Sequence, residues 1–148
     1  MRSLGIDHGE KRIGIAVSDP TGTLARPLTI LAHTSQTQDA AQVLGLASAH
    51  GVELIVVGQS TNEAGQLNLA GRRAHGFAEF LRSTTSIPVI LWDESLSTQD
   101  ARAMRVKGGA SRKRRARAVD ALAAAVMLQS FLDSGGPAPA DARASQNA

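Results

Sequence analysis

Residues 5–19, GIDHGEKRIGIAVSD, contain the pattern that decides the fold. A short apolar run over 4–6 ends at the acid Asp7, and the segment 8–11 separates it from a second apolar run over 13–17. Two apolar runs joined by a short polar segment with a glycine are typical of a β-hairpin. The sequence therefore predicts two strands, 2–7 and 12–18, with a carboxylate at the end of the first.

The rest of the chain continues as an α/β pattern. Further apolar runs predict three more strands, at 24–31, 52–57 and 88–92. Pro27 indicates that the first of these lies at an edge of the sheet, because proline cannot donate a hydrogen bond to a neighbouring strand. Helical spacing of apolar residues and helix start signals predict helices at 37–50, 66–83, 97–106 and 114–133, with a polar loop at 58–65.

This order of elements predicts a mixed five-stranded sheet flanked by helices. The first three strands should form an antiparallel meander, and the last two, which enter through helical crossovers, should run parallel to the first. We expect one domain over residues 1–133. Residues 134–148 are rich in Gly, Pro, Ala and polar residues, which predicts a disordered tail.

Composition excludes several classes of site and location. The 148 residues are 43% hydrophobic and 20% charged, as in an ordinary globular domain. The chain has no cysteine, which excludes disulfides, thiolate metal sites and a cysteine nucleophile. No apolar run approaches the roughly 18 residues of a membrane span, and the N-terminus shows no signal-peptide pattern. We therefore expect a cytoplasmic protein without membrane contact.

Positive charge is concentrated in residues 102–117. This segment holds eight of the 16 Lys and Arg residues and no acid, while the remainder of the chain has an excess of acids. Such a block is typical of binding to a polyanion, and arginine in particular forms bidentate contacts with phosphate. The alternative is a solvated basic loop. The residues that we expect to bind nucleic acid here are Arg102, Arg105, Lys107, Arg112, Lys113, Arg114 and Arg115.

Four acids occupy positions where they could meet. Asp7 and the pair Asp93–Glu94 follow strands that should be parallel, so they should emerge at the same edge of the sheet. Asp120 shares a helical face with small apolar residues, where a carboxylate is costly unless it is paired. Clustered carboxylates suit Mg²⁺ or Mn²⁺, which can support phosphoryl chemistry. The sequence therefore suggests a metal-dependent nuclease.

Each of these residues also has a structural interpretation. Asp7 could cap the turn, Asp93 or Glu94 could stabilise a helix N-terminus, and Asp120 could pair with Arg117. Strand alternation predicts that His8 faces away from Asp7.

Two further features concern the substrate. Lys11 and Arg12 could contact phosphate or form a solvated hairpin end. With three Phe, one Trp and no Tyr, the chain offers no obvious platform for stacking bases, so recognition should use backbone and shape.

Four segments resemble the YqgF family, also called the RuvX, Holliday-junction-resolvase-like or pre-16S ribosomal RNA nuclease family. They are GIDHGEKRIGIAVSD (5–19), VVGQSTNEAG (56–65), LWDESLST (91–98) and AVDALAAAVMLQSFL (118–132). The resemblance covers residues 1 to about 133 and implies a ribonuclease H-like fold. It also implies a cytoplasmic bacterial enzyme that processes the 5′ end of pre-16S RNA or acts on branched DNA.

The family's functional residues match this sequence position by position. Its first-strand acid matches Asp7, its Asp-Glu pair matches Asp93 and Glu94, and its last-helix acid matches Asp120. Its Lys-Arg after the turn matches Lys11 and Arg12. The resemblance thus implies that Asp7, Glu94 and Asp120 are the catalytic metal ligands, with Asp93 supporting them.

The sequence departs from the family pattern at two places. Ser95 stands where the family usually has Arg, and Gln59-Ser60 stand where it usually has an apolar residue and Pro. A third point is geometric, because related nucleases commonly carry the second acid on the strand beside the first. Here Glu94 follows a strand one position further out, roughly 10 Å away on a spacing near 4.8 Å.

These observations favour a divalent-metal phosphodiesterase acting on structured RNA, most simply pre-16S RNA. The alternatives are a resolvase of branched DNA and a nucleic-acid-binding factor without catalysis. An actin-like ATPase or sugar kinase is a further alternative, but such enzymes need two lobes and this chain supplies one. The sequence is compatible with a monomer or a homodimer.

Overall fold

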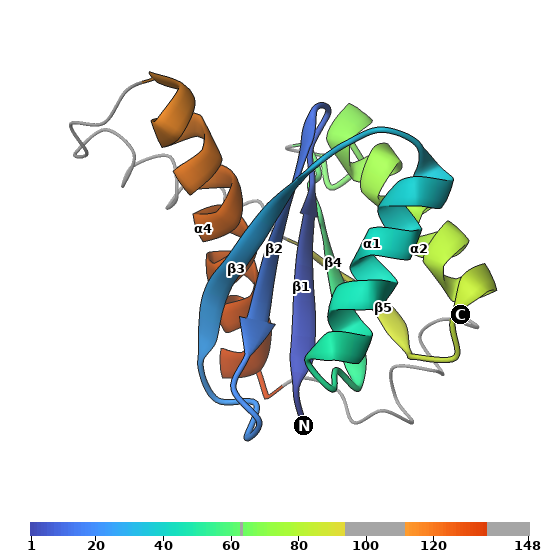
Figure 1. Ribbon diagram of the computed structural model, residues 1–148. Helices are drawn as coiled ribbons and strands as arrows, with labels where there is room; N and C mark the ends of the chain where they lie inside the picture. Colours follow the sequence, from blue (N-terminus) through green and yellow to red (C-terminus); the bar gives the residue numbers. More distant parts are fainter. Residues whose placement is uncertain (63, 94–111, 136–148) are drawn as a thin grey trace.

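The computed structural model describes residues 1–62, 64–93 and 112–135, and for residues 112–120 it describes the backbone alone. Strands and helices follow one another in the predicted α/β order (Figure 1). The strands are β1 (Ser3–His8), β2 (Arg12–Ser18), β3 (Ala25–Ala32), β4 (Leu54–Gln59) and β5 (Val89–Asp93). The helices are α1 (Gln36–Ala49), α2 (Leu69–Thr84) and α4 (Arg112–Asp133).

The strands form one five-stranded sheet in the order β3-β2-β1-β4-β5. Strands β1, β2 and β3 are paired antiparallel, whereas β4 pairs parallel with both β1 and β5. The predicted mixed sheet is therefore confirmed. Strand β3 lies at an edge, as Pro27 indicated, and the β2–β3 register shifts between Ile15 and Ala16, beside the pair Ala16–Pro27.

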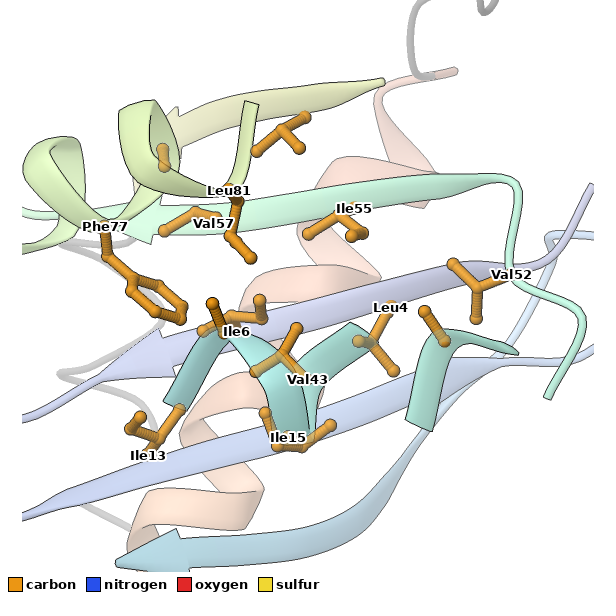
Figure 2. Close-up of a cluster of buried hydrophobic side chains, with 14 of the residues drawn as sticks. Leu4, Ile6, Ile13, Ile15, Val43, Val52, Ile55, Val57, Phe77 and Leu81 are labelled. Carbon is orange, nitrogen blue, oxygen red and sulfur yellow. The ribbon is translucent and has the colours of Figure 1, made fainter. Parts of the chain in front are cut away.

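Helices cover both faces of the sheet (Figure 1). On one face, α1 and α2 pack on alternate strand residues such as Leu4, Ile6 and Ile15, and Figure 2 shows Val43 and Phe77 of these helices among them. On the other face, α4 packs on a second cluster that includes Val56 and Ile90. Because successive strand residues point to opposite faces, the central strands are apolar on both sides.

Several boundaries differ from the prediction by two or three residues. Helix α2 begins at Leu69 instead of 66, because the Asn68 side chain caps it by accepting a hydrogen bond from Gly71 N at 2.8 Å. Strand β4 begins at Leu54 because Gly51, with φ at +63°, and Val52 still belong to the turn after α1. It ends at Gln59, inside the predicted loop, because its pairing with β5 extends that far.

Some predictions fall on the part of the chain that is not described. The helix expected at 97–106 lies there, as do residues 136–148 of the expected tail. Across the described residues, no helix is long and apolar enough to cross a membrane.

The turn between β2 and β3 is held by one carboxylate. Asp19 accepts hydrogen bonds from the backbone N–H groups of Thr23 and Leu24 at 2.8 and 2.9 Å, and from Thr21 N at 3.3 Å. The Thr21 hydroxyl donates to the same carboxylate. These bonds, led by that from Leu24, hold the pKa of Asp19 well below its usual range. The turn is therefore stabilised by the ionised carboxylate.

We expect Asp19→Ala to lower the melting temperature at neutral pH. Because the pKa is lower in the folded chain than in the unfolded chain, the carboxylate stabilises the fold above about pH 4. This contribution is lost progressively as the pH falls further. Thermal unfolding of both proteins between pH 7 and pH 2.5 checks this, with Glu53→Gln, at an exposed position, as the control. A melting-temperature difference that does not change with pH would contradict it.

Candidate active site at the carboxyl end of the sheet

Asp7 lies one residue before the end of β1, where the backbone turns tightly into β2. Its side chain is half-buried, and its register partner on β2 is Gly14. The turn closes through a hydrogen bond from Gly9 N to Arg12 O at 2.8 Å. A Cβ atom at Gly9 would lie 2.7 Å from that same oxygen, so the turn requires glycine. The glycine thus fixes the backbone that carries Asp7.

Helix α4 crosses the Asp7 face of the sheet at very short range. A Cβ atom on Gly5 would lie 2.9 Å from Leu128 Cβ and 3.3 Å from the carbonyl oxygen of Ala124. Nearer the start of β1, Ser3 lines the same small cavity as Phe131. Moving along β1 from residue 3 to residue 5 therefore corresponds to moving from 131 to 124 along α4. Asp7 lies two residues further along β1, and the backbone of Asp120 lies four residues, about one helical turn, further along α4.

Asp93 and Glu94 are placed less fully. Asp93 is the last residue of β5, is exposed, and pairs in register with Gln59 of β4. Because strand residues alternate between the two faces, Asp93 lies on the same face as Leu91, which packs toward α1 and α2. Asp7 lies on the opposite face. Glu94 lies outside the described residues. Strand β4 separates β1 from β5, as the sequence predicted. Two strand spacings, roughly 10 Å, therefore lie between β1, which carries Asp7, and β5, which ends at Asp93.

The basic residues are divided between two places. Lys11 is exposed and Arg12 half-buried, at the hairpin end beside Asp7. The predicted residues Arg112, Lys113, Arg114 and Arg115 form the first turn of α4, whose backbone is described. Arg102, Arg105 and Lys107 lie outside the described residues.

The opposite face carries a cluster that the sequence analysis missed. His8 faces away from Asp7, as alternation predicted, and its ring lies 5.3 Å from that of His33 and 4.8 Å from that of Phe77, centroid to centroid. The His33 ring in turn is hydrogen-bonded to the buried carboxylate of Asp39. Burial, followed by the proximity of His33, lowers the pKa of His8 to about 4, so its imidazole is neutral. The sequence held one signal for this cluster, because Asp39 falls in the first turn of a predicted helix that follows His33.

Comparisons with known proteins identify the family. Residues 1–134 match the family described as RuvX, Holliday junction resolvase. The chain belongs to this family. A relative from Geobacillus kaustophilus named "Putative pre-16S rRNA nuclease" is 42% identical over 136 residues, covering 90% of this chain and 99% of that protein. A relative of the same name from Thermoanaerobacter pseudethanolicus is 39% identical over 135 residues, covering 90% and 97%.

Solved structures agree on the fold. A RuvC from T. thermophilus in complex with a Holliday junction substrate superposes with a TM-score of 0.58 at 20% identity, covering 93% of this chain and 98% of that chain. The fowlpox virus resolvase in complex with a Holliday junction superposes with a TM-score of 0.55 at 11% identity, covering 90% and 98%. The predicted family and the ribonuclease H-like fold are thus confirmed. The relatives' names also agree with the predicted enzyme class, a nuclease.

We expect Gly5→Ala to destabilise the protein, because its Cβ atom would push α4 away from β1. Overpacking of this kind costs about 1–3 kcal/mol. Gly45→Ala is the matched control, since Gly45 lies on the exposed face of α1 with no atom within 4 Å of the added Cβ. Alanine in a helix interior should there raise stability by roughly 0.5–1 kcal/mol. Urea unfolding measures both changes, and equal effects would contradict the close approach of α4.

Proposed function

We propose that this protein is a divalent-metal-dependent nuclease that uses Asp7, Glu94 and Asp120. The observation that carries the proposal is the placement of Asp7 at the carboxyl end of β1, with α4 packed against Gly5 and Asp120 one turn beyond that contact. This placement of the two backbones, which come from distant parts of the chain, supports a site shared by Asp7 and Asp120. Open α/β sheets bind their ligands at the carboxyl ends of their strands.

The position of Asp93 supports a division of roles between the two neighbouring acids. Asp93 belongs to the face of β5 that is opposite to Asp7, so it is suited to a supporting role. Glu94 lies outside the described residues and enters the proposal on its place in the sequence pattern alone. We therefore propose that Glu94 binds the metal ion and that Asp93 supports the residues that bind it.

The carboxylate oxygens fit Mg²⁺ or Mn²⁺, which prefer hard oxygen ligands and substrate phosphate. When bound, such an ion would stabilise the charge that develops on the phosphate and activate a water molecule. The half-buried position of Asp7 leaves it open to solvent, so a phosphate and a water can approach it.

The first turn of α4 supplies four consecutive basic residues at the same end of the sheet. With Lys11 and Arg12 on the hairpin, they would bind the phosphate backbone on either side of the acids. We include Arg102, Arg105 and Lys107 in this surface on the strength of their sequence alone. Backbone contacts of this kind position a substrate by its shape and not by its bases.

We infer that the substrate is the 5′ end of pre-16S RNA, processed in the cytoplasm during ribosome assembly. The names of relatives about 40% identical over nearly their whole length favour this substrate. The family description favours a second candidate, branched DNA of the Holliday-junction type. A homodimer would present two basic surfaces to one duplex, while a monomer would present one.

We expect Asp7→Asn to abolish cleavage while binding persists. The amide keeps the shape of the side chain but removes its charge, so a metal ion is held more weakly. A labelled pre-16S 5′ fragment and a four-way DNA junction, each tested with Mg²⁺, Mn²⁺ or EDTA, measure cleavage and name the substrate. Asp133→Asn, at the far end of α4, is the control and should cut normally. Cleavage that survives Asp7→Asn or EDTA would overturn the proposal.

We expect replacement of Arg112, Lys113, Arg114 and Arg115 by Gln to weaken binding of either nucleic acid. Each phosphate contact that is lost should reduce the slope of log K against log salt by about 0.7–0.9. Fluorescence anisotropy at several salt concentrations measures this slope. The control is Arg26→Gln, an exposed position on the edge strand β3. An unchanged slope would exclude the start of α4 from the binding surface.

A further inference from the structure

We propose that His8, His33 and Asp39 form a separate binding site for a transition-metal ion of the Zn²⁺ class. The site lies at the carboxyl end of β1 but on the sheet face opposite to Asp7. It does not depend on the proposed nuclease activity, because none of its three residues belongs to the carboxylate set.

The geometry brings three donors from separate segments together. His8 comes from the end of β1, His33 from the connection after β3, and Asp39 from the first turn of α1. One ligand atom of each lies within 4.8 Å of the other two. Atoms bound to one tetrahedral zinc ion at about 2.0–2.1 Å are roughly 3.3–3.5 Å apart, so a small rotation of the side chains closes the site. The His33 side chain is 33% exposed, so its ring has room for that rotation.

His8 supplies a second, independent reason. Its side chain is only 7% exposed, and its Nδ1 atom is buried without a hydrogen-bond partner among the described residues. A buried polar atom that lacks a partner is costly, and such atoms in native proteins commonly indicate an ion or a functional role. An imidazole nitrogen in this position is a ready metal ligand.

Asp39 is oriented in advance. The backbone N–H of Thr34 donates to its Oδ1 atom at 3.1 Å, which leaves Oδ2 for the ring of His33. An ion would take the place of the proton between His33 and Asp39, and that proton would move to the exposed ring nitrogen or to solvent. The carboxylate also offsets the positive charge of Arg73, which acts on His8 from α2.

The donor set defines the kind of ion. Two imidazole nitrogens and one carboxylate oxygen suit Zn²⁺, Co²⁺ or Ni²⁺ and disfavour Mg²⁺, which prefers oxygen ligands alone. The exposed side of His33 leaves the fourth position to water. A bound ion would tie the start of α1 to the end of β1, one residue from Asp7, and would thus hold the backbone that carries the acid.

Co²⁺ is the probe, because four-coordinate Co²⁺ absorbs visible light. Chelator-treated wild-type protein should bind one Co²⁺ with such a band, and Zn²⁺ should displace it. In His33→Ala, binding should weaken on the order of 100-fold, since one of three protein ligands is lost. His75→Ala removes an exposed histidine of α2 and should bind as the wild type does. Asp7→Asn should also bind normally, which separates this site from the carboxylates.

Thermal unfolding gives a second measurement. Zn²⁺ at a hundredfold excess over its dissociation constant should raise the melting temperature of the wild type by about 5–10 °C, and that of His33→Ala much less. A wild type that shows no Co²⁺ band, or a His33→Ala protein that binds Co²⁺ and is stabilised as well as the wild type, would overturn the proposal. A site lost in Asp7→Asn but kept in His33→Ala would overturn it as well.

Discussion

The close contact between β1 and α4 at Gly5 is the constraint on which the candidate active site depends. A Cβ atom at this position would meet Leu128 at 2.9 Å, so only glycine allows the helix to lie at its present depth. Small residues on the helix, including the buried Ala124 and Ala125, complete the contact. Because the helix is rigid, its depth at Gly5 also sets where the backbone of Asp120 lies relative to Asp7. Packing in the interior thus also fixes the distance between the backbones of Asp7 and Asp120.

Strand β1 uses its alternation to separate two kinds of chemistry. Asp7 faces the α4 side of the sheet, where the basic start of α4 also lies, while His8 faces α1 and α2. Asp7 therefore lies on one face of the sheet, and the imidazoles of His8 and His33 lie on the other face with Asp39. Ions that prefer oxygen and ions that prefer nitrogen would be separated by the thickness of one strand. The shared backbone at the end of β1 would couple the two.

The sequence predicted most of the fold because its patterns are local. The hairpin, the edge position of Pro27 and the apolar run over 52–57 each follow from the chemistry of neighbouring residues. The boundaries were less certain because distant partners decide them. Gln59 belongs to β4 only because it pairs with Asp93, and α2 begins late because the Asn68 side chain caps it. The sequence predicted that Asp7 lies near the end of the first strand and that His8 faces away from it. It missed the buried Asp39, whose carboxylate is hydrogen-bonded to His33 in the connection after β3.

The sequence by itself determined the class of element at nearly every described position, the parallel direction of β4 and β5, and the kinship to the RuvX family. These depend on periodicity, turn chemistry and motif spacing, all of which act within short stretches. Only the tertiary structure decided how close α4 lies to β1, which sheet face Asp93 belongs to, and that His8, His33 and Asp39 meet. Those features depend on atoms far apart in the chain that approach within a few ångströms, and no local pattern records such distances.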